Sequence, residues 1–173
     1  MLQLNIPTSI KIIINENWIK IEGPLGVIIK KKSPSLTIFF DANTRLLFLK
    51  HKNTFLNGFY LKIINQLIWG VWKGYCKKLK IIGVGYKISL MEDCLEFKVG
   101  FSHTISYKIP KNIKIKILNK KLLIFLIFGI DFQKVTQTAA EIIALKPVDA
   151  YKGKGIKYFE QVTVLKEGKK TNV

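Results

Sequence analysis

The feature that most constrains the fold of this chain is an internal repeat. When the chain is shifted against itself by 77 residues, segments of similar apolar pattern fall on one another. The aligned pairs are Ile19–Gly23 with Glu96–Gly100, Leu36–Phe40 with Ile113–Ile117, and Leu46–Leu49 with Leu123–Leu126. A single offset that aligns so many segments indicates that one structural unit occurs twice. The fold must therefore be one that about half of this chain can complete.

Each copy has the pattern of several short strands followed by one helix. Alternating residues, as in Trp18–Glu22, are typical of half-buried strands. We expect strands at 10–14, 17–22, 26–31, 36–40 and 45–50, and in the second copy near 79–90, 95–100, 104–109, 113–118 and 122–128. The helices are expected at 54–69 and near 131–145. This order predicts an α+β fold of two tandem duplicated domains, each of short antiparallel strands packed with one helix.

The ends of both predicted helices carry recognisable signals. Thr54 and Asp131 occupy equivalent positions in the two copies. Each is a predicted N-cap, whose side-chain oxygen accepts a hydrogen bond from an unpaired N–H group of the first helical turn. Gly70 is the predicted C-cap of the first helix, and Pro147 is expected to stop the second.

The charge of the chain indicates a polyanionic partner. It has 29 Lys+Arg against 11 Asp+Glu, a formal net charge of +18, while 49% of its residues are hydrophobic and can build a core. We expect the domain boundary near Lys78, and the domains 1–78 and 79–173 each carry a net charge of +9. Positive charge of this size repels itself unless a counter-charge is near. Nucleic acid and an anionic membrane surface are the leading candidates.

Membrane association has little support in the sequence. The longest apolar run, Leu122–Ile130, has nine residues, against the roughly 20 that a transmembrane helix needs, so we expect no membrane span. The helix predicted at 54–69 contains one lysine, which argues against a basic amphipathic helix lying on a membrane. The segment Met1–Asn5 lacks the features of a signal or transit peptide, so we expect no cleavage.

Signals for catalysis and metal binding are weak. The adjacent carboxylates Glu92 and Asp93 lie in a predicted hairpin turn, and the remaining ones are scattered. His51 and His103 fall in different copies. The two cysteines show no disulfide or zinc pattern. We therefore predict that the chain is not an enzyme, with no metal and no cofactor. The alternative, a small metal-dependent nuclease, would need clustered Asp, Glu or His residues.

The segment Tyr151–Lys157 combines glycines with alternating lysines. Glycines let backbone N–H groups approach phosphate oxygens, lysines neutralise phosphates, and the Tyr151 ring can stack on a base or ribose. The alternative is a solvated loop beyond the last helix. Gly83–Lys87 is either a phosphate-contacting loop or a bent strand, and Gly100–Thr104 is either such a loop or a plain hairpin. Further lysine groups, solvated or in contact with nucleic acid, are Lys30–Lys32, Lys77–Lys80, Lys166, Lys169 and Lys170.

These motifs occur together, and in this order, in one protein family. The segment Gly70–Tyr86, the turn Gly100–His103 and the signature Asp149–Ile156 closely resemble the bacterial-type large-subunit ribosomal protein L6. The turn Ile21–Gly26 resembles that family's N-terminal turn. Residues that fit the second helix of the family are Gln133, Gln137, Ala139 and Ala140. Order and spacing match across essentially the whole chain.

The resemblance implies two tandem domains of like fold in a structural protein of the large ribosomal subunit. In this family the C-terminal domain makes most of the contact with large-subunit rRNA, beside the sarcin-ricin loop and near the site where translation factors dock. Neighbouring ribosomal proteins are further implied partners. The implied RNA-binding residues are Lys77, Lys78, Gly83, Gly85, Tyr86, Lys87, Ser102, His103, Tyr151, Lys152, Gly153, Lys154, Gly155 and Lys157.

Composition adds an expectation about origin. Arg45 is the only arginine, and Lys, Ile, Phe, Asn and Tyr, the residues of A/T-rich codons, are abundant. This pattern is typical of a strongly A/T-biased genome such as that of an organelle. We expect the protein in the mitochondrial ribosome, with a plastid ribosome or the bacterial cytoplasm as alternatives. Trp69 and Trp72 belong to an unusually apolar first copy and are expected at a protein-facing surface.

Overall fold

The computed structural model describes residues 2–168 of the chain. Lys169 and Lys170, both considered above as possible contacts to nucleic acid, lie outside these described residues. Within the described range, no helix is long and apolar enough to cross a membrane.

The internal contacts of the chain divide it into two compact units. The division falls between Tyr75 and Cys76, and the short segment Ile130–Phe132 groups with the first unit. The boundary expected near Lys78 lies inside a strand, β7 (Tyr75–Ile82), so a cut at that residue would break the strand.

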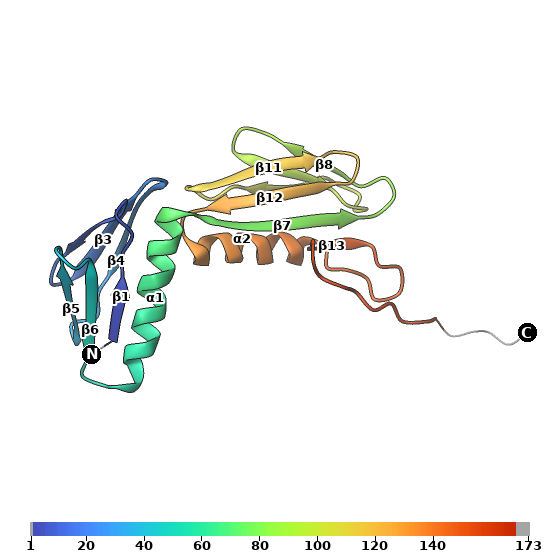
Figure 1. The fold of residues 1–173 in the computed structure, drawn as a ribbon. Coiled ribbons are helices and arrows are strands. Elements are labelled where there is room, and N and C mark those ends of the chain that lie inside the picture. Colours follow the sequence, from blue (N-terminus) through green and yellow to red (C-terminus); the bar gives the residue numbers. More distant parts are fainter. Residues whose placement is uncertain (1, 169–173) are drawn as a thin grey trace, which may run out of the picture. The chain divides into compact units, whose positions relative to one another are not determined.

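The first unit consists of two small antiparallel sheets and one helix (Figure 1). One sheet has the strand order β2-β3-β4 and the other has the order β1-β6-β5. The elements are β1 (Leu2–Asn5), β2 (Lys11–Ile14), β3 (Trp18–Gly23), β4 (Gly26–Lys31), β5 (Leu36–Asp41), β6 (Leu46–His51) and α1 (Phe55–Trp72). The helix contacts strands of both sheets, namely β1, β3, β4 and β6.

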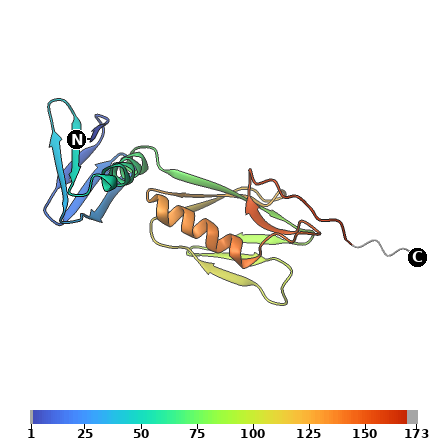
Figure 2. The same ribbon diagram turned by 90° about the horizontal axis from the view of Figure 1, so that it is seen from below.

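The second unit repeats this plan and extends it by one strand. Its sheets have the orders β10-β9-β8 and β11-β12-β7-β13, and Figure 2 shows α2 running lengthwise along them. After β7 the elements are β8 (Lys87–Leu90), β9 (Cys94–Lys98), β10 (Ile105–Lys108), β11 (Ile113–Asn119), β12 (Ile124–Gly129), α2 (Phe132–Leu145) and β13 (Gly155–Tyr158).

The duplication predicted from the repeat is confirmed. The sheet β1-β6-β5 corresponds to β7-β12-β11, and β2-β3-β4 corresponds to β8-β9-β10. The helices α1 and α2 begin at Phe55 and Phe132, which are separated by the same offset of 77 residues. β13 has no counterpart in the first unit, where α1 leads directly into β7. The α+β fold class is therefore correct, and the second unit carries the added strand.

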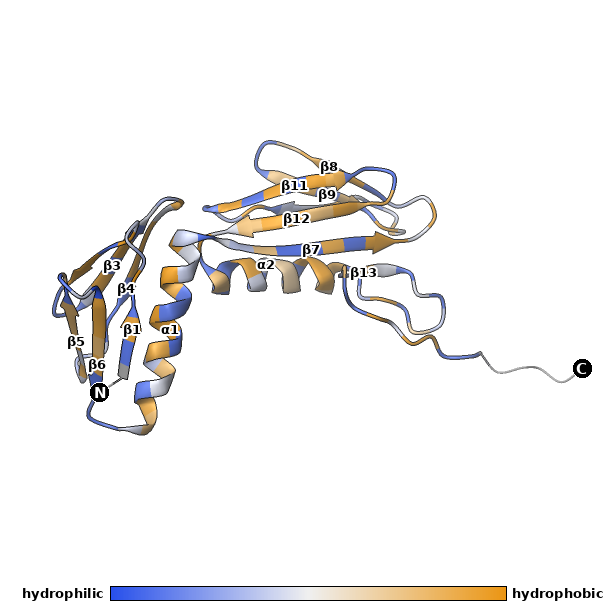
Figure 3. Cartoon of the chain, in the orientation of Figure 1, coloured by the Kyte–Doolittle hydropathy of each residue, from blue (hydrophilic) through white to orange (hydrophobic). Residues whose placement is uncertain are grey.

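Each helix packs on its sheets through one apolar face. The buried residues of α1 include Ile64, Leu67, Ile68 and Val71, and those of α2 are Val135, Thr138, Ala139 and Ile142. Spacings of three and four residues place each set on a single helical face. In the second unit the rings of Phe97 and Phe125, 6.2 Å apart, connect the two sheets through the core. Apolar residues run along the strands of both units (Figure 3).

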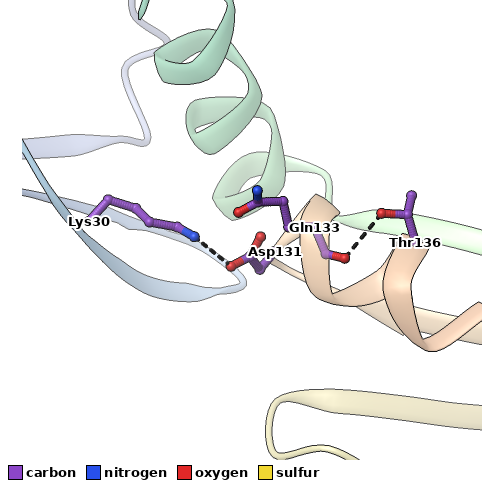
Figure 4. Close-up of polar contacts among 4 residues, drawn as sticks. All are labelled: Lys30, Asp131, Gln133 and Thr136. Carbon is purple, nitrogen blue, oxygen red and sulfur yellow. Dashed lines mark hydrogen bonds and ion pairs between the residues drawn. The ribbon is translucent and has the colours of Figure 1, made fainter. Parts of the chain in front are cut away.

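The first turns of the two helices differ from each other. The Thr54 side chain makes no capping hydrogen bond, so this predicted N-cap is wrong. Instead the N–H of Phe55 donates to Oδ1 of Asn53 at 3.1 Å. Asp131 directly precedes α2, where an N-cap was predicted, and its Oδ2 lies 3.1 Å from Nζ of Lys30 on β4 (Figure 4).

The predicted end of the first helix at Gly70 is also wrong. α1 continues to Trp72 and ends near Gly74, whose φ of +77° is the conformation in which glycine commonly terminates helices. Gly70 serves a packing role, because a Cβ there would collide with the backbone oxygen of Ile130. A close approach of two backbones requires glycine as much as a helix end does.

Two strand predictions are corrected in the second unit. The strand expected near 79–90 is broken, because β7 ends before a turn in which the N–H of Tyr86 donates to the oxygen of Gly83 at 3.4 Å. Gly85 in this turn has φ of +77°. The segment expected as a loop beyond the last helix contains β13, with Ile156 completely buried.

In the first unit, the structure adds a strand, β1, that was not predicted from the sequence.

The single arginine of the chain has a structural role. The Arg45 guanidinium donates through Nε to the oxygen of Ile6 at 3.2 Å, and through Nη2 to those of Pro7 at 2.6 Å and Ile10 at 3.0 Å. A planar group with several fixed donors can satisfy three carbonyls at once, whereas a lysine ammonium is a compact point charge on a flexible stem. These hydrogen bonds connect the β5–β6 turn, which contains Arg45, to the segment between β1 and β2.

We predict that Arg45→Lys lowers the free energy of unfolding of the first unit by about 1–3 kcal/mol, because carbonyls lose charge-assisted hydrogen bonds. All three tryptophans, Trp18, Trp69 and Trp72, lie in this unit, so urea denaturation followed by tryptophan fluorescence measures the change. Lys52→Arg, at an exposed position, is the control and should leave the midpoint unchanged. Equal midpoints for both variants would contradict the structural role of Arg45.

Candidate nucleic-acid interface

Most of the predicted RNA-binding residues lie on three connections of the second unit, which we call the loop end. The connections are Gly83–Tyr86 between β7 and β8, Gly100–Thr104 between β9 and β10, and Asp149–Lys154 between α2 and β13. Gly155 pairs with Ile82, which brings the third connection beside the first. Residues widely separated in sequence therefore meet at one end of this unit.

The Tyr86 ring joins the first two connections. A Cβ on Gly83 would lie 2.5 Å from the ring, and a Cβ on Gly100 would lie 3.2 Å from it. A side chain at Gly83 would therefore displace the ring, and one at Gly100 would require it to shift by a few tenths of an ångström. Tyr86 is half-buried, so its first role is to hold these two turns together.

Asp149 organises the third connection. Its carboxylate accepts hydrogen bonds from the N–H of Tyr151 at 3.1 Å and of Lys152 at 3.2 Å. Its backbone oxygen accepts from the N–H of Gly153 at 2.9 Å, and its own N–H donates to the oxygen of Lys154 at 2.9 Å. The loop is thus closed around one acidic residue, a local arrangement for which aspartate is well suited.

This geometry corrects the expected phosphate cradle. The N–H groups of Tyr151, Lys152 and Gly153 are already bonded to Asp149, so they do not point outward to receive phosphate. The two glycines are explained by the fold. Gly153 is buried with φ of +67°, and a Cβ on Gly155 would lie 2.6 Å from the oxygen of Pro147.

The loop end exposes side chains, rather than these backbone N–H groups, to solvent. Tyr151 is 60% exposed, and Lys152 and Lys154 are exposed beside it. On the neighbouring connection Ser102 is exposed, and the exposed His103 ring stacks with Phe101 at 6.2 Å. Lysine ammonium groups and an accessible aromatic ring are groups that contact RNA phosphates and bases.

Lys87 and Gly155 directly adjoin the loop end as the first residues of β8 and β13, and three further predicted residues lie away from it. Lys77 and Lys78 belong to β7, with their Nζ atoms 5.8 Å and 3.6 Å from the ring centroids of Tyr158 and Phe159. Lys157 lies on β13, where its Nζ donates to Oγ1 of Thr163 at 3.3 Å. The structure therefore separates the predicted site into a loop group and a strand group.

Sequence reasoning did not foresee one contact beside the loop end. Lys146, just after α2, places its Nζ 4.5 Å from the ring centroid of Phe101. This contact links the end of α2 to the β9–β10 connection. Phe101 belongs to the Gly100–Thr104 connection already considered from the sequence, and only the position of α2 beside that connection shows its relation to Lys146.

The histidine of the first unit has a structural environment. His51 is buried in the first unit, where its Nε2 lies 2.8 Å from Oγ of Ser35 and its ring stacks on Tyr60 at 5.2 Å. Among residues 2–168, no group of three or more His, Cys, Asp or Glu residues is placed to hold a metal ion.

We predict that Gly155→Ala destabilises the second unit by more than about 2 kcal/mol, because the new Cβ collides with backbone and the φ of +147° is unfavourable for alanine. Gly85→Ala is the matched control. It shares a positive φ but has open space around it, so about 1–2 kcal/mol is expected.

Circular dichroism during urea denaturation measures both glycine variants, and tryptophan fluorescence follows the first unit separately. If Gly155→Ala were no more destabilising than Gly85→Ala, the close approach of Pro147 would not be the reason that the fold requires glycine at position 155.

Known proteins match this chain over almost its whole length. The family model described as Ribosomal protein L6 matches residues 82–159. The chain is 37% identical to the large ribosomal subunit protein uL6m of Reclinomonas americana, covering 97% of this chain and 96% of that protein. It is 34% identical to the large ribosomal subunit protein uL6 of an Azoarcus species, covering 95% and 94%. On this similarity, together with its duplicated α+β fold, the chain belongs to the ribosomal protein L6 family.

Proposed function

We propose that this protein is a structural constituent of the large ribosomal subunit and binds large-subunit rRNA through the loop end of its second unit. The relatives carry the name of a large ribosomal subunit protein, and the family is structural rather than enzymatic. In keeping with the resemblance, we further propose that the contact lies beside the sarcin-ricin loop, near the translation-factor site.

The observation that carries this proposal is the exposed basic side chains of the loop end. Asp149, the acidic residue of its third connection, uses its carboxylate to bind backbone N–H groups. It therefore fixes the shape of the loop, and Lys152 and Lys154 project from it. Lys87, at the start of β8, stands directly opposite Lys98 on β9. Like charges in opposed positions destabilise a sheet, and RNA phosphates would relieve that repulsion.

The first unit is proposed to face neighbouring ribosomal proteins. Trp69 is 42% exposed, and the Nζ of Lys73 lies 4.5 Å from its ring centroid and 4.6 Å from that of Trp72. Phe55 and Phe59, also on α1, are exposed by 91% and 57%. Exposed apolar residues of this number are typical of protein interaction surfaces.

We propose that the protein belongs to the mitochondrial ribosome. Two observations support this location. The similar protein from Reclinomonas is a mitochondrial uL6m, and the positive charge of this chain is supplied almost entirely by lysine, with one arginine. Purified mitochondria and their large subunits, probed with an antibody to the chain, would test the location.

We predict that Lys152→Gln combined with Lys154→Gln weakens binding to cognate large-subunit rRNA. Each phosphate that is no longer neutralised should reduce the slope of log K against log salt by about 0.7–0.9. Filter binding of the full chain over a range of salt concentrations measures the slope. The fold should be preserved, because both side chains are exposed.

The matched control is Lys108→Gln with Lys111→Gln, which removes the same charge from exposed positions at the end of β10 and just after it. This control should retain affinity close to that of the unchanged chain. Equal decreases in affinity for the two double variants would show that binding depends on total charge, and the assignment of the loop end would then be wrong.

A further inference from the structure

The four-stranded sheet of the second unit has one face in the core and one face outside it. On β7 the residues Leu79 and Ile81 are buried, and on β12 the same is true of Phe125 and Ile127. The residues between them point to the opposite face, because successive side chains of a strand alternate. We call this outer surface of β11, β12, β7 and β13 the sheet face.

The sheet face is basic. Its lysines are Lys114 and Lys116 on β11, Lys78 and Lys80 on β7, and Lys157 on β13. None of the four strands, all within the described part of the chain, contains an Asp or Glu. The acidic residue at its border is Glu160, which lines a cavity of about 430 Å³ together with Lys78 and Leu126.

The lysines form two rows on either side of an apolar strand. Lys114 and Lys116 pair with Phe128 and Leu126 of β12, whose side chains are half-buried. The second row lies on β7 and β13. Because neighbouring strands are about 4.8 Å apart, the rows on β11 and β7 are separated by roughly 10 Å. Positive charge is thus spread across the whole width of the sheet.

The second row contains an unfavourable pair. Lys80 and Lys157 stand directly opposite each other on β7 and β13. Opposed like charges destabilise neighbouring strands, so an anionic partner would stabilise this arrangement.

Two basic rows without intervening carboxylates match the phosphates of a nucleic-acid backbone. Recognition of unpaired bases would instead use exposed aromatic rings on the strands, and Phe128 of the central strand is half-buried.

We propose that the sheet face binds a second segment of RNA through its phosphates, separate from the segment bound by the loop end. This inference rests on the proposed function, since it assumes that the protein binds rRNA. It assigns Lys80, Lys114 and Lys116 to RNA binding and groups them with Lys78 and Lys157. The protein then holds two RNA segments together, rather than docking on one.

The first test changes Lys114 and Lys116 to Gln in the full chain. Both are exposed, and circular dichroism checks that the fold is kept. The salt slope for cognate large-subunit rRNA should fall by about 0.7–0.9 for each phosphate that is no longer neutralised. Combination with Lys152→Gln and Lys154→Gln should give additive decreases, because separate sites act independently. The Lys108→Gln, Lys111→Gln variant is the matched control.

The second test uses a thiol that the sheet face already has. Cys76 is exposed and precedes Lys78 on β7 by two residues, on the same face. With Cys94 changed to Ser, an iron–EDTA probe attached to Cys76 should cleave the rRNA near the sheet face. In a second variant both native cysteines become Ser, and Tyr151→Cys carries the probe at the loop end. The two probes should cleave different rRNA segments.

The outcomes separate this inference from the function on which it rests. One outcome is that only the probe at Tyr151→Cys cleaves the rRNA and that the Lys114→Gln, Lys116→Gln variant keeps the normal salt dependence. This outcome would contradict RNA binding by the sheet face and leave the proposed function intact. Cleavage of the same nucleotides by both probes would contradict the binding of a second, separate RNA segment. Failure of the unchanged chain to bind the rRNA overturns the proposed function itself.

Discussion

The pairing of β13 with β7 positions much of the basic surface of the second unit. It depends on Gly155, because any side chain there would collide with the backbone at Pro147. Once the strands pair, the connection organised by Asp149 lies beside the β7–β8 turn, and Lys157 stands opposite Lys80. One backbone contact therefore contributes both to the loop end and to the sheet face. A glycine that a sequence motif associates with RNA binding acts first through the fold.

The two units share one plan but differ in the surfaces that they expose. Both bury one helical face against two small sheets. The second unit adds β13 at the edge of its larger sheet, and the charges of that strand and its connection come with it. The first unit lacks this strand and exposes apolar residues such as Phe55 and Phe39. Equal net charges of the two halves therefore accompany different surfaces, and we propose that one binds RNA and the other faces protein.

Arginine and lysine have different roles in this protein. Arg45 binds three carbonyl oxygens inside the first unit, a role that needs its planar set of donors. The exposed positive charge of the second unit is entirely lysine. Lysine binds phosphate as a point charge, so a surface that neutralises an RNA backbone does not require the arginine fork. A lysine-rich composition is thus compatible with the proposed role.

The sequence by itself determined the duplication, the α+β class and most of the elements, because alternation and helical spacing are local properties that each segment carries. The alternation of Ile113–Ile117 already places its lysines on one face of a strand. Which strands lie beside it is decided by contacts between residues far apart in the chain. The same is true of Gly70, which is glycine because Ile130 approaches it, and of β13, whose hydrogen-bond partners lie on β7. The N–H groups of Tyr151 and Lys152 turn toward Asp149 through local hydrogen bonds, but only the tertiary structure places that loop beside the β7–β8 turn, because the partners of β13 lie more than 70 residues earlier in the chain.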